Sequence, residues 1–217
     1  MIEAVILISE PALTKEEFDA LLSMVSPEKQ ERILRYRFFR DAQNSLLGDI
    51  LARTEICRAT GLENQQLVFS VNEFGKPFLT NAPPIHHNIS HTEKYIACVV
   101  ANEPAGIDIE RVRPIDLKIA KRFFAPDETA YIMEEPCPRR FFEVWTQKES
   151  LIKREGRGLS KPLHSFSVFD PTEAGHYCRV FENDEAICHV CTSDGESPTI
   201  RVIGTDMLKH GLLNGRI

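Results

Sequence analysis

Long apolar runs and an excess of basic charge are both missing from this 217-residue chain. No run approaches the ~20 apolar residues of a membrane-spanning helix, and Glu3 stands where a secretory signal carries basic residues. The 26 Lys and Arg residues against 32 Asp and Glu give a net charge of −6, whereas general nucleic-acid binding needs a basic surface. We therefore expect a cytoplasmic protein that binds neither membranes nor nucleic acid.

The metal-binding patterns of cysteine and histidine are incomplete. The six cysteines contain one C-x-x-C pair, Cys188 and Cys191, and a structural zinc site needs a second pair at similar spacing. In a reducing compartment such cysteines pack as small apolar thiols, which we expect here. His87 and His91 would share a ligand face only in a helix, which Pro83-Pro84 opposes. The sequence therefore disfavours a zinc site.

Apolar periodicity and turn residues divide the chain into helices and strands. Helices are predicted at 15–25, 27–37, 41–59, 117–124, 126–135 and 138–155. Strands are predicted at 5–8, 67–71, 95–100, 105–109, 166–169, 178–181, 187–191 and 200–203, with 95–100 and 105–109 paired as a hairpin. Both halves of the chain run from a strand through helices to several strands. We therefore predict an α+β fold of two similar α/β halves, residues 1–103 and 104–217.

The segment Gly106-Ile107-Asp108-Ile109-Glu110 is the first candidate site. On a strand, alternate side chains share a face, so Asp108 and Glu110 would lie about 7 Å apart while the two isoleucines point into the core. Paired carboxylates repel unless they stay solvated, share a proton or hold a cation, and oxygen ligands of this kind suit Mg²⁺. The alternative is an exposed strand edge with its polar residues turned outward.

The helix predicted at 138–155 is the second candidate. Glu149 and Lys153 stand four residues apart, which by itself predicts a plain ion pair within the helix. Beside bulky aromatic residues such as Trp145, an acid next to a lysine is also a suitable arrangement for a base and a leaving-group acid.

Two further groups of residues suit phosphate binding. Ser90 and His91 follow an extended segment and can donate to phosphate oxygens, and Lys76 adds a positive charge. Lys29 and Arg32 begin a cationic row at helical spacing. Such a row is either a solvated helix face or a surface that attracts phosphate.

Four motifs in this order resemble the phosphopantetheinyl transferases of the surfactin-synthetase-activating type. They are Phe74-Gly75-Lys76-Pro77, Asn88-Ile89-Ser90-His91, Gly106-Ile107-Asp108-Ile109-Glu110 and Trp145-x-x-Lys148-Glu149-Ser150-x-x-Lys153-x-x-Gly156-x-Gly158-Leu159. The resemblance spans residues 29–163 and includes the linking segment Phe123-Phe124-Ala125-Pro126-Asp127-Glu128. It implies a monomeric pseudodimer with coenzyme A in the cleft between the halves. The implied reaction moves the phosphopantetheine arm to a serine of an apo acyl or peptidyl carrier protein and releases adenosine 3',5'-bisphosphate.

The resemblance also implies roles for individual residues. Asp108, Glu110 and Glu149 match the family's Mg²⁺ ligands, Glu149 being also the candidate base, and Lys153 would stabilise or protonate the departing phosphate. The positions that match coenzyme A ligands are Lys29, Arg32, Ser45, Lys76, Pro77, Ser90, His91, Asp108 and Lys153. Two positions depart from the pattern. Asn44 stands where many relatives have arginine, and Ile109 stands where others have a polar residue, so we expect water in that metal position.

The carrier protein implied by the family is an acidic helical bundle. A cationic and apolar segment, Lys118 to Phe124 with Lys121 and Arg122, is therefore a candidate docking surface, although core packing is the alternative for Phe123 and Phe124. Two other functions stay open from the sequence. One is a Mg²⁺-dependent phosphohydrolase acting on coenzyme A with water in place of serine, and the other is a non-catalytic carrier-binding protein.

Overall fold

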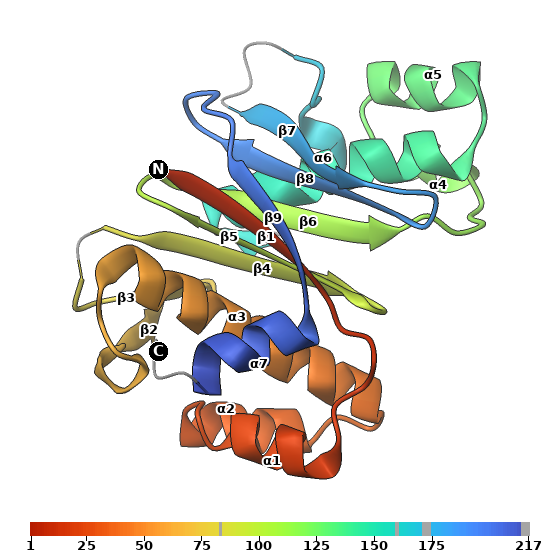
Figure 1. The fold of residues 1–217 in the computed structure, drawn as a ribbon. Helices are drawn as coiled ribbons and strands as arrows, with labels where there is room; N and C mark the ends of the chain where they lie inside the picture. The colour runs from red at the N-terminus through yellow and green to blue at the C-terminus, as the bar shows by residue number, and fades with distance from the viewer. Residues whose placement is uncertain (83, 159–160, 171–174, 214–217) are drawn as a thin grey trace.

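Two β-sheets lie face to face at the centre of the molecule, and helices cover the outer side of each (Figure 1). The computed structural model describes residues 1–82, 84–158, 161–170 and 175–213. Pro83, which argued against a helix at the histidines, and Leu159, the last residue of the fourth motif, lie outside them. None of the helices described is both long and apolar enough to cross a membrane.

The first sheet has the strand order β4-β5-β1-β9. Its strands are β1 (Ile2–Ile8), β4 (His86–Thr92), β5 (Tyr95–Ala101) and β9 (Thr199–Gly204). The second sheet, ordered β6-β8-β7, contains β6 (Gly106–Arg111), β7 (His176–Glu182) and β8 (Ala186–Thr192). A short ribbon pairs β2 (Phe69–Val71) with β3 (Pro77–Leu79).

Helices of the two halves occupy opposite sides of the sheets (Figure 1). Beside the first sheet lie α1 (Lys15–Leu22), α2 (Pro27–Leu34), α3 (Phe39–Thr60) and α7 (Thr205–Leu213), with a 3-10 turn, η1 (Asn64–Gln66). Beside the second sheet lie α4 (Lys118–Phe123), α5 (Pro126–Glu134), α6 (Pro138–Glu155) and the 3-10 turn η3 (Leu163–Ser165).

The same local topology occurs twice. In each half a strand leads to a long helix and then to a hairpin, whose second strand pairs antiparallel with the first strand: β1, α3 and β4–β5, then β6, α6 and β7–β8. Both long helices end at a glycine with positive φ, Gly61 and Gly156. The predicted α+β fold of two related halves agrees with this arrangement. The last strand, β9, crosses back and pairs parallel with β1 of the first sheet.

Alternate side chains of the inner strand β1 point into two of the three apolar layers. Val5 and Leu7 of β1 face the layer under α3, whereas Ala4 and Ile6 face the second sheet. The third layer lies between the second sheet and α6, where Phe141 packs. All six cysteines are free thiols, and Cys188 and Cys191 belong to different apolar layers.

Several element boundaries follow local signals in the sequence. The capping box of Thr14 and Glu17 begins α1, and α6 covers the residues predicted for it, 138–155. Helix α2 stops at Leu34, before the predicted end at 37, because residues 34–37 are exposed and offer no face to pack. A helix continues where tertiary packing supports it.

The predicted hairpin of 95–100 with 105–109 is wrong. Strand β5 pairs with β4 and β1, while β6 pairs with β8 in the other sheet. Strand β5 is apolar on both faces and β6 has one apolar face, of Ile107 and Ile109, so an apolar pattern alone does not specify which strand pairs with which. One partner of β5, strand β4, was not predicted from the sequence because its polar side chains interrupt the apolar pattern.

The predicted strand at 166–169 is also wrong. This segment follows η3 as a turn, although Phe166 and Val168 are buried. Its backbone serves a different purpose, since the Phe166 carbonyl accepts from Lys148 and the Val168 N–H donates to Glu128. These backbone groups bind the buried ion pair of Lys148 with Glu128 rather than another strand.

Candidate functional site

Strands β4 and β6 and helix α6 converge on one polar cluster. Asn88 of β4 accepts a hydrogen bond from the Ile107 backbone N–H at 3.0 Å, which fixes β4 beside β6. Asp108 and Glu110 then face α6, while Ile107 and Ile109 enter the apolar layer between the sheets, as the alternation predicted. Ile109 therefore offers no ligand to the cluster.

Asp108 is the centre of this cluster. Its Oδ1 accepts from Ser90 Oγ at 2.7 Å and from Lys153 Nζ at 2.6 Å, and Lys153 also reaches Ser90 Oγ at 2.9 Å. The Asp108 side chain is buried, and Oδ2 accepts no hydrogen bond from the described residues. An unsatisfied buried carboxylate oxygen is costly, so this oxygen is an available acceptor for a cation or a donor.

Glycine at position 106 allows α6 to approach β6 closely. A Cβ atom there would overlap the Ser150 carbonyl oxygen and the Arg154 backbone nitrogen, and would lie 3.0 Å from the Arg154 Cα. Close approach of helix to strand is a known use of glycine. The contact sets the distance at which Lys153 reaches Asp108.

Two further carboxylates, those of Glu110 and Glu149, lie close enough to Asp108 for its charge to shift their pKa values. Burial, followed by the charge of Asp108, raises the pKa of Glu110, and Arg113 at 3.3 Å opposes that shift. Burial, followed by the charge of Asp108, also raises the pKa of Glu149, and the charge of Lys153 opposes that shift. Mutual repulsion of three carboxylates favours a bound cation between them.

The donor set fits a hard divalent cation. The described ranges hold no preformed cage of three His, Cys, Asp or Glu side chains. Mg²⁺ does not require one, because it binds through one or two carboxylates together with water and substrate phosphates. The unpartnered Oδ2 of Asp108 and the raised pKa values of Glu110 and Glu149 are therefore compatible with Mg²⁺.

Two neighbouring grooves lie beside this cluster. One, of about 310 Å³, is lined by residues that include Lys76, Pro77, Asn88, Glu149 and Lys153. The next, of about 530 Å³, shares Gly75 and Pro77 with it and is lined by Lys29, Arg32 and Arg53 among others. The first groove thus meets the cluster through Glu149 and Lys153. The second, called the cationic groove below, carries three cations, together with the carboxylates of Glu28 and Asp49.

Other predicted residues occupy different surroundings. The pKa of His91 in β4 is lowered by desolvation and by the nearby charges of Lys153 and Lys29. Lys29 itself lies 3.6 Å from Asp49. Ser45 is buried in α3, one helical turn before Asp49, which lines the second groove. Beside it, Asn44 bonds to Ser9 and to the Glu93 carbonyl, and so supports the β4–β5 turn.

The role of Lys148 was not predicted from the sequence. Its ammonium is fully buried and donates to both oxygens of Glu128, at 2.7 and 2.6 Å, and to the Phe166 carbonyl at 2.6 Å. A signal was present, because Lys148 stands on one helical stripe with Phe141, Val144 and Leu151, where a lysine needs a buried partner.

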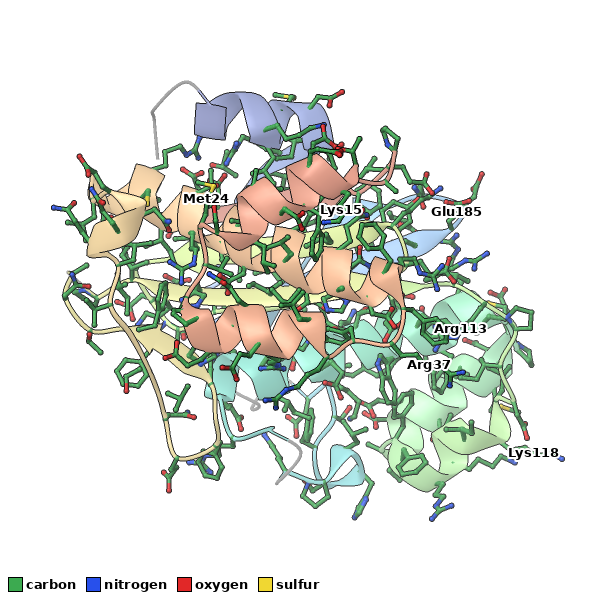
Figure 2. All side chains as sticks on the ribbon, turned by 90° about the horizontal axis from the view of Figure 1, so that it is seen from below. Lys15, Met24, Arg37, Arg113, Lys118 and Glu185 are labelled. Atoms are coloured by element: carbon green, nitrogen blue, oxygen red, sulfur yellow. The ribbon has the colours of Figure 1, made fainter. Side chains whose placement is uncertain are left out.

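The candidate docking surface on α4 is only partly exposed. Phe124 is buried and its ring stacks on Phe141 at 5.1 Å, so its proposed role in docking is wrong and core packing holds. Phe123 is exposed and lies under the Arg122 guanidinium. Figure 2 shows Lys118 projecting outward from this helix.

Comparison with known proteins finds one family in both halves. A model described as the 4'-phosphopantetheinyl transferase superfamily matches residues 104–206, and one described as 4'-phosphopantetheinyl transferase, N-terminal, matches residues 11–105.

Individual relatives cover most of the chain. The 4'-phosphopantetheinyl transferase Sfp of Bacillus subtilis (strain 168) is 43% identical over 159 residues, 72% of this chain and 71% of its own. A second 4'-phosphopantetheinyl transferase of Bacillus subtilis is 38% identical over 187 residues, 85% of this chain and 83% of its own. The gsp transferase of Aneurinibacillus migulanus is 40% identical over 171 residues, 77% of this chain and 71% of its own.

Proposed function

The chain belongs to the 4'-phosphopantetheinyl transferase superfamily, and we propose that its transfer reaction takes place at the cluster of Asp108, Glu149 and Lys153. The protein is an enzyme that transfers the phosphopantetheine arm of coenzyme A to a serine of an apo acyl or peptidyl carrier protein. Adenosine 3',5'-bisphosphate is the other product. The observation that carries this assignment is the contact of Lys153 with Asp108 beside a groove that Glu149 also lines.

The reaction forms one bond to phosphorus and breaks another. The carrier serine oxygen bonds to the phosphorus that bears the pantetheine arm, and the bond from that phosphorus to the bridging pyrophosphate oxygen breaks. Glu149 accepts the serine proton, directly or through water, and Lys153 stabilises or protonates the departing phosphate. The hydrogen bond from Lys153 to Asp108 holds its ammonium in place for that step.

A divalent metal ion completes this proposal. Asp108, Glu110 and Glu149 would hold Mg²⁺, which when bound neutralises charge on the pyrophosphate. With Ile109 in an apolar layer, water would fill the remaining metal position. The donor oxygens suit Mg²⁺ by their chemistry.

The rest of coenzyme A would occupy the two grooves. Lys29 and Arg32 line the cationic groove and suit the ribose phosphate, and Pro77 borders both grooves beside the nucleotide. Ser90 and His91 suit the pyrophosphate, and Lys76 stands in the same loop as Pro77. Ser45, one helical turn before Asp49 of the cationic groove, would also contact the nucleotide. We propose a monomer in which the cleft lies between residues 1–103 and 104–217.

Intact-mass spectrometry of an apo carrier protein tests the function. Incubation with this protein, coenzyme A and Mg²⁺ is expected to add one phosphopantetheine arm to the carrier. Glu149→Gln or a chelator is expected to abolish the gain, while the exposed Glu16→Gln leaves it unchanged. Coenzyme A cleaved without a modified carrier would indicate a phosphohydrolase. Carrier binding with neither product would indicate a non-catalytic protein.

A further inference from the structure

Lys76 donates its hydrogen bonds to the end of a helix in the other half of the chain. Its Nζ lies 2.5 Å from the Lys153 carbonyl oxygen and 3.2 Å from that of Arg154, in the last turn of α6. Carbonyl groups in the last turn of a helix carry its partial negative charge, which favours a cation. Lys76 therefore satisfies the helix end with an ammonium, and this contact joins the two halves.

A second bond from the same loop reaches the residue after the helix. Asn72 Nδ2 donates to the Gly156 carbonyl at 3.0 Å, while Asn72 Oδ1 accepts from the Lys76 N–H at 2.8 Å. Gly156 has φ +71°, and a Cβ there would lie 2.9 Å from the Lys76 Cδ. The loop from Asn72 to Lys76 thus packs directly against the end of α6.

The contact bears on the proposed reaction through Lys153. The backbone carbonyl of this residue binds Lys76, and its side-chain ammonium binds Asp108 at 2.6 Å. Burial, aided by the charge of Arg154, lowers the pKa of Lys76 to about 8, in keeping with an ammonium removed from water. The family resemblance implies instead that the Lys76 ammonium contacts the nucleotide.

We propose that Lys76 is a positioning residue, which holds the end of α6, and with it Lys153 and Glu149, instead of binding the phosphates of coenzyme A. This inference rests on the proposed function. Lys29 is the contrasting residue, because it lines the cationic groove and has its ammonium 3.6 Å from Asp49. Removing the two ammonium groups should therefore have different effects.

A substrate that lacks one phosphate separates the two roles. Coenzyme A and 3'-dephospho-coenzyme A are compared in calorimetric binding and in carrier modification, using the wild type, Lys76→Met and Lys29→Met. Lys76→Met is expected to lower kcat on both substrates on the order of 10–100-fold by misplacing α6. Although Lys76 lines the first groove, its ammonium is bound to α6 carbonyls, so the affinity for either substrate should change by less than about twofold. Lys29→Met should reduce the preference for coenzyme A about tenfold.

Loss of affinity in Lys76→Met would overturn the inference. A loss confined to coenzyme A would place the ammonium on the ribose phosphate, and an equal loss for both substrates would place it on the pyrophosphate. Lys76→Gln, which keeps an amide donor, replaces Lys76→Met if thermal melting shows that the latter is unfolded. A wild type that binds coenzyme A but modifies no carrier would refute the proposed function, while the affinities would still decide the role of Lys76.

Discussion

Lys153 of α6 places its ammonium 2.6 Å from Oδ1 of Asp108 in β6, although the two residues are 45 positions apart in the chain. Asp108 is buried, and Lys153 is partly exposed toward the groove that it lines. One Asp108 oxygen thus binds the helix and the other is left without a hydrogen bond. The pair brings two sequence motifs together in one site. One oxygen of the Asp108 carboxylate positions Lys153, and the other is available to bind a ligand.

Asp108→Asn should remove most of the activity. The amide retains the shape of the side chain but loses the charge that holds Lys153 and attracts a cation. We expect the rate of carrier modification to fall about 100-fold or more, as for loss of one preorganised electrostatic group. Single-turnover mass spectrometry measures this rate. Ser90→Ala removes one of the two bonds to Oδ1 and should cost about tenfold. Equal rates for Asp108→Asn and the wild type would contradict the assignment.

Gly106→Ala should separate α6 from β6. The added methyl group overlaps backbone atoms of Ser150 and Arg154, which cannot move as a side chain can. We expect a loss of stability of about 1–3 kcal/mol from overpacking, together with a larger fall in kcat than in carrier affinity. Denaturant unfolding and steady-state kinetics measure both quantities.

Gly204→Ala is the matched control for that variant. A Cβ at Gly204 meets nothing within 4 Å, so this substitution should alter neither stability nor kcat appreciably. If Gly106→Ala behaves like this control, then the close approach of helix to strand has no part in positioning Lys153.

The sequence predicted those elements whose signal is local. The capping box of α1, the extent of α6 and the shared face of Asp108 with Glu110 all depend on residues within a few positions. The strand partners of β5 and β6 depend on the whole chain, because an apolar strand face fits any buried position: β5 has two such faces, and β6 has one. Lys76 was recognised as part of a motif, but its contact with α6 joins residues 77 positions apart.

The ion pair of Lys148 and Glu128 should be required for stability. Both side chains are fully buried, and Glu128 also accepts from the Ala125 and Val168 backbone N–H groups. Lys148→Met leaves the Glu128 charge without its partner, which should lower the free energy of unfolding by about 3–5 kcal/mol. Adding Glu128→Gln to Lys148→Met should restore part of the loss in urea unfolding. Strictly additive losses would show that the two charges are not coupled.

Stability should fall with acid through His189. Burial lowers the pKa of this imidazole to about 3, and its Nδ1 lies 2.8 Å from Thr146 Oγ1. The unfolded chain binds a proton near pH 6.5 while the folded chain does not, so acidification favours unfolding below that pH. The free energy of unfolding should therefore drop about 2 kcal/mol more between pH 7 and pH 5 in the wild type than in His189→Gln. Parallel pH profiles would contradict a neutral, buried His189.

The positive charge on α4 should determine the affinity for the carrier protein without changing the affinity for coenzyme A. Lys121 and Arg122 are exposed beside Phe123, and acidic carrier proteins should be attracted to them. Changing both to Glu should raise the KM for the carrier about tenfold, and leave the calorimetric affinity for coenzyme A unchanged. Lys15→Glu, on the exposed side of α1, gives the same change of net charge as either single substitution and is the control for Lys121→Glu and for Arg122→Glu made separately. Because Phe124 is buried against Phe141, the apolar part of the contact would come from Phe123. Unaltered carrier kinetics in the double variant would place the docking surface elsewhere.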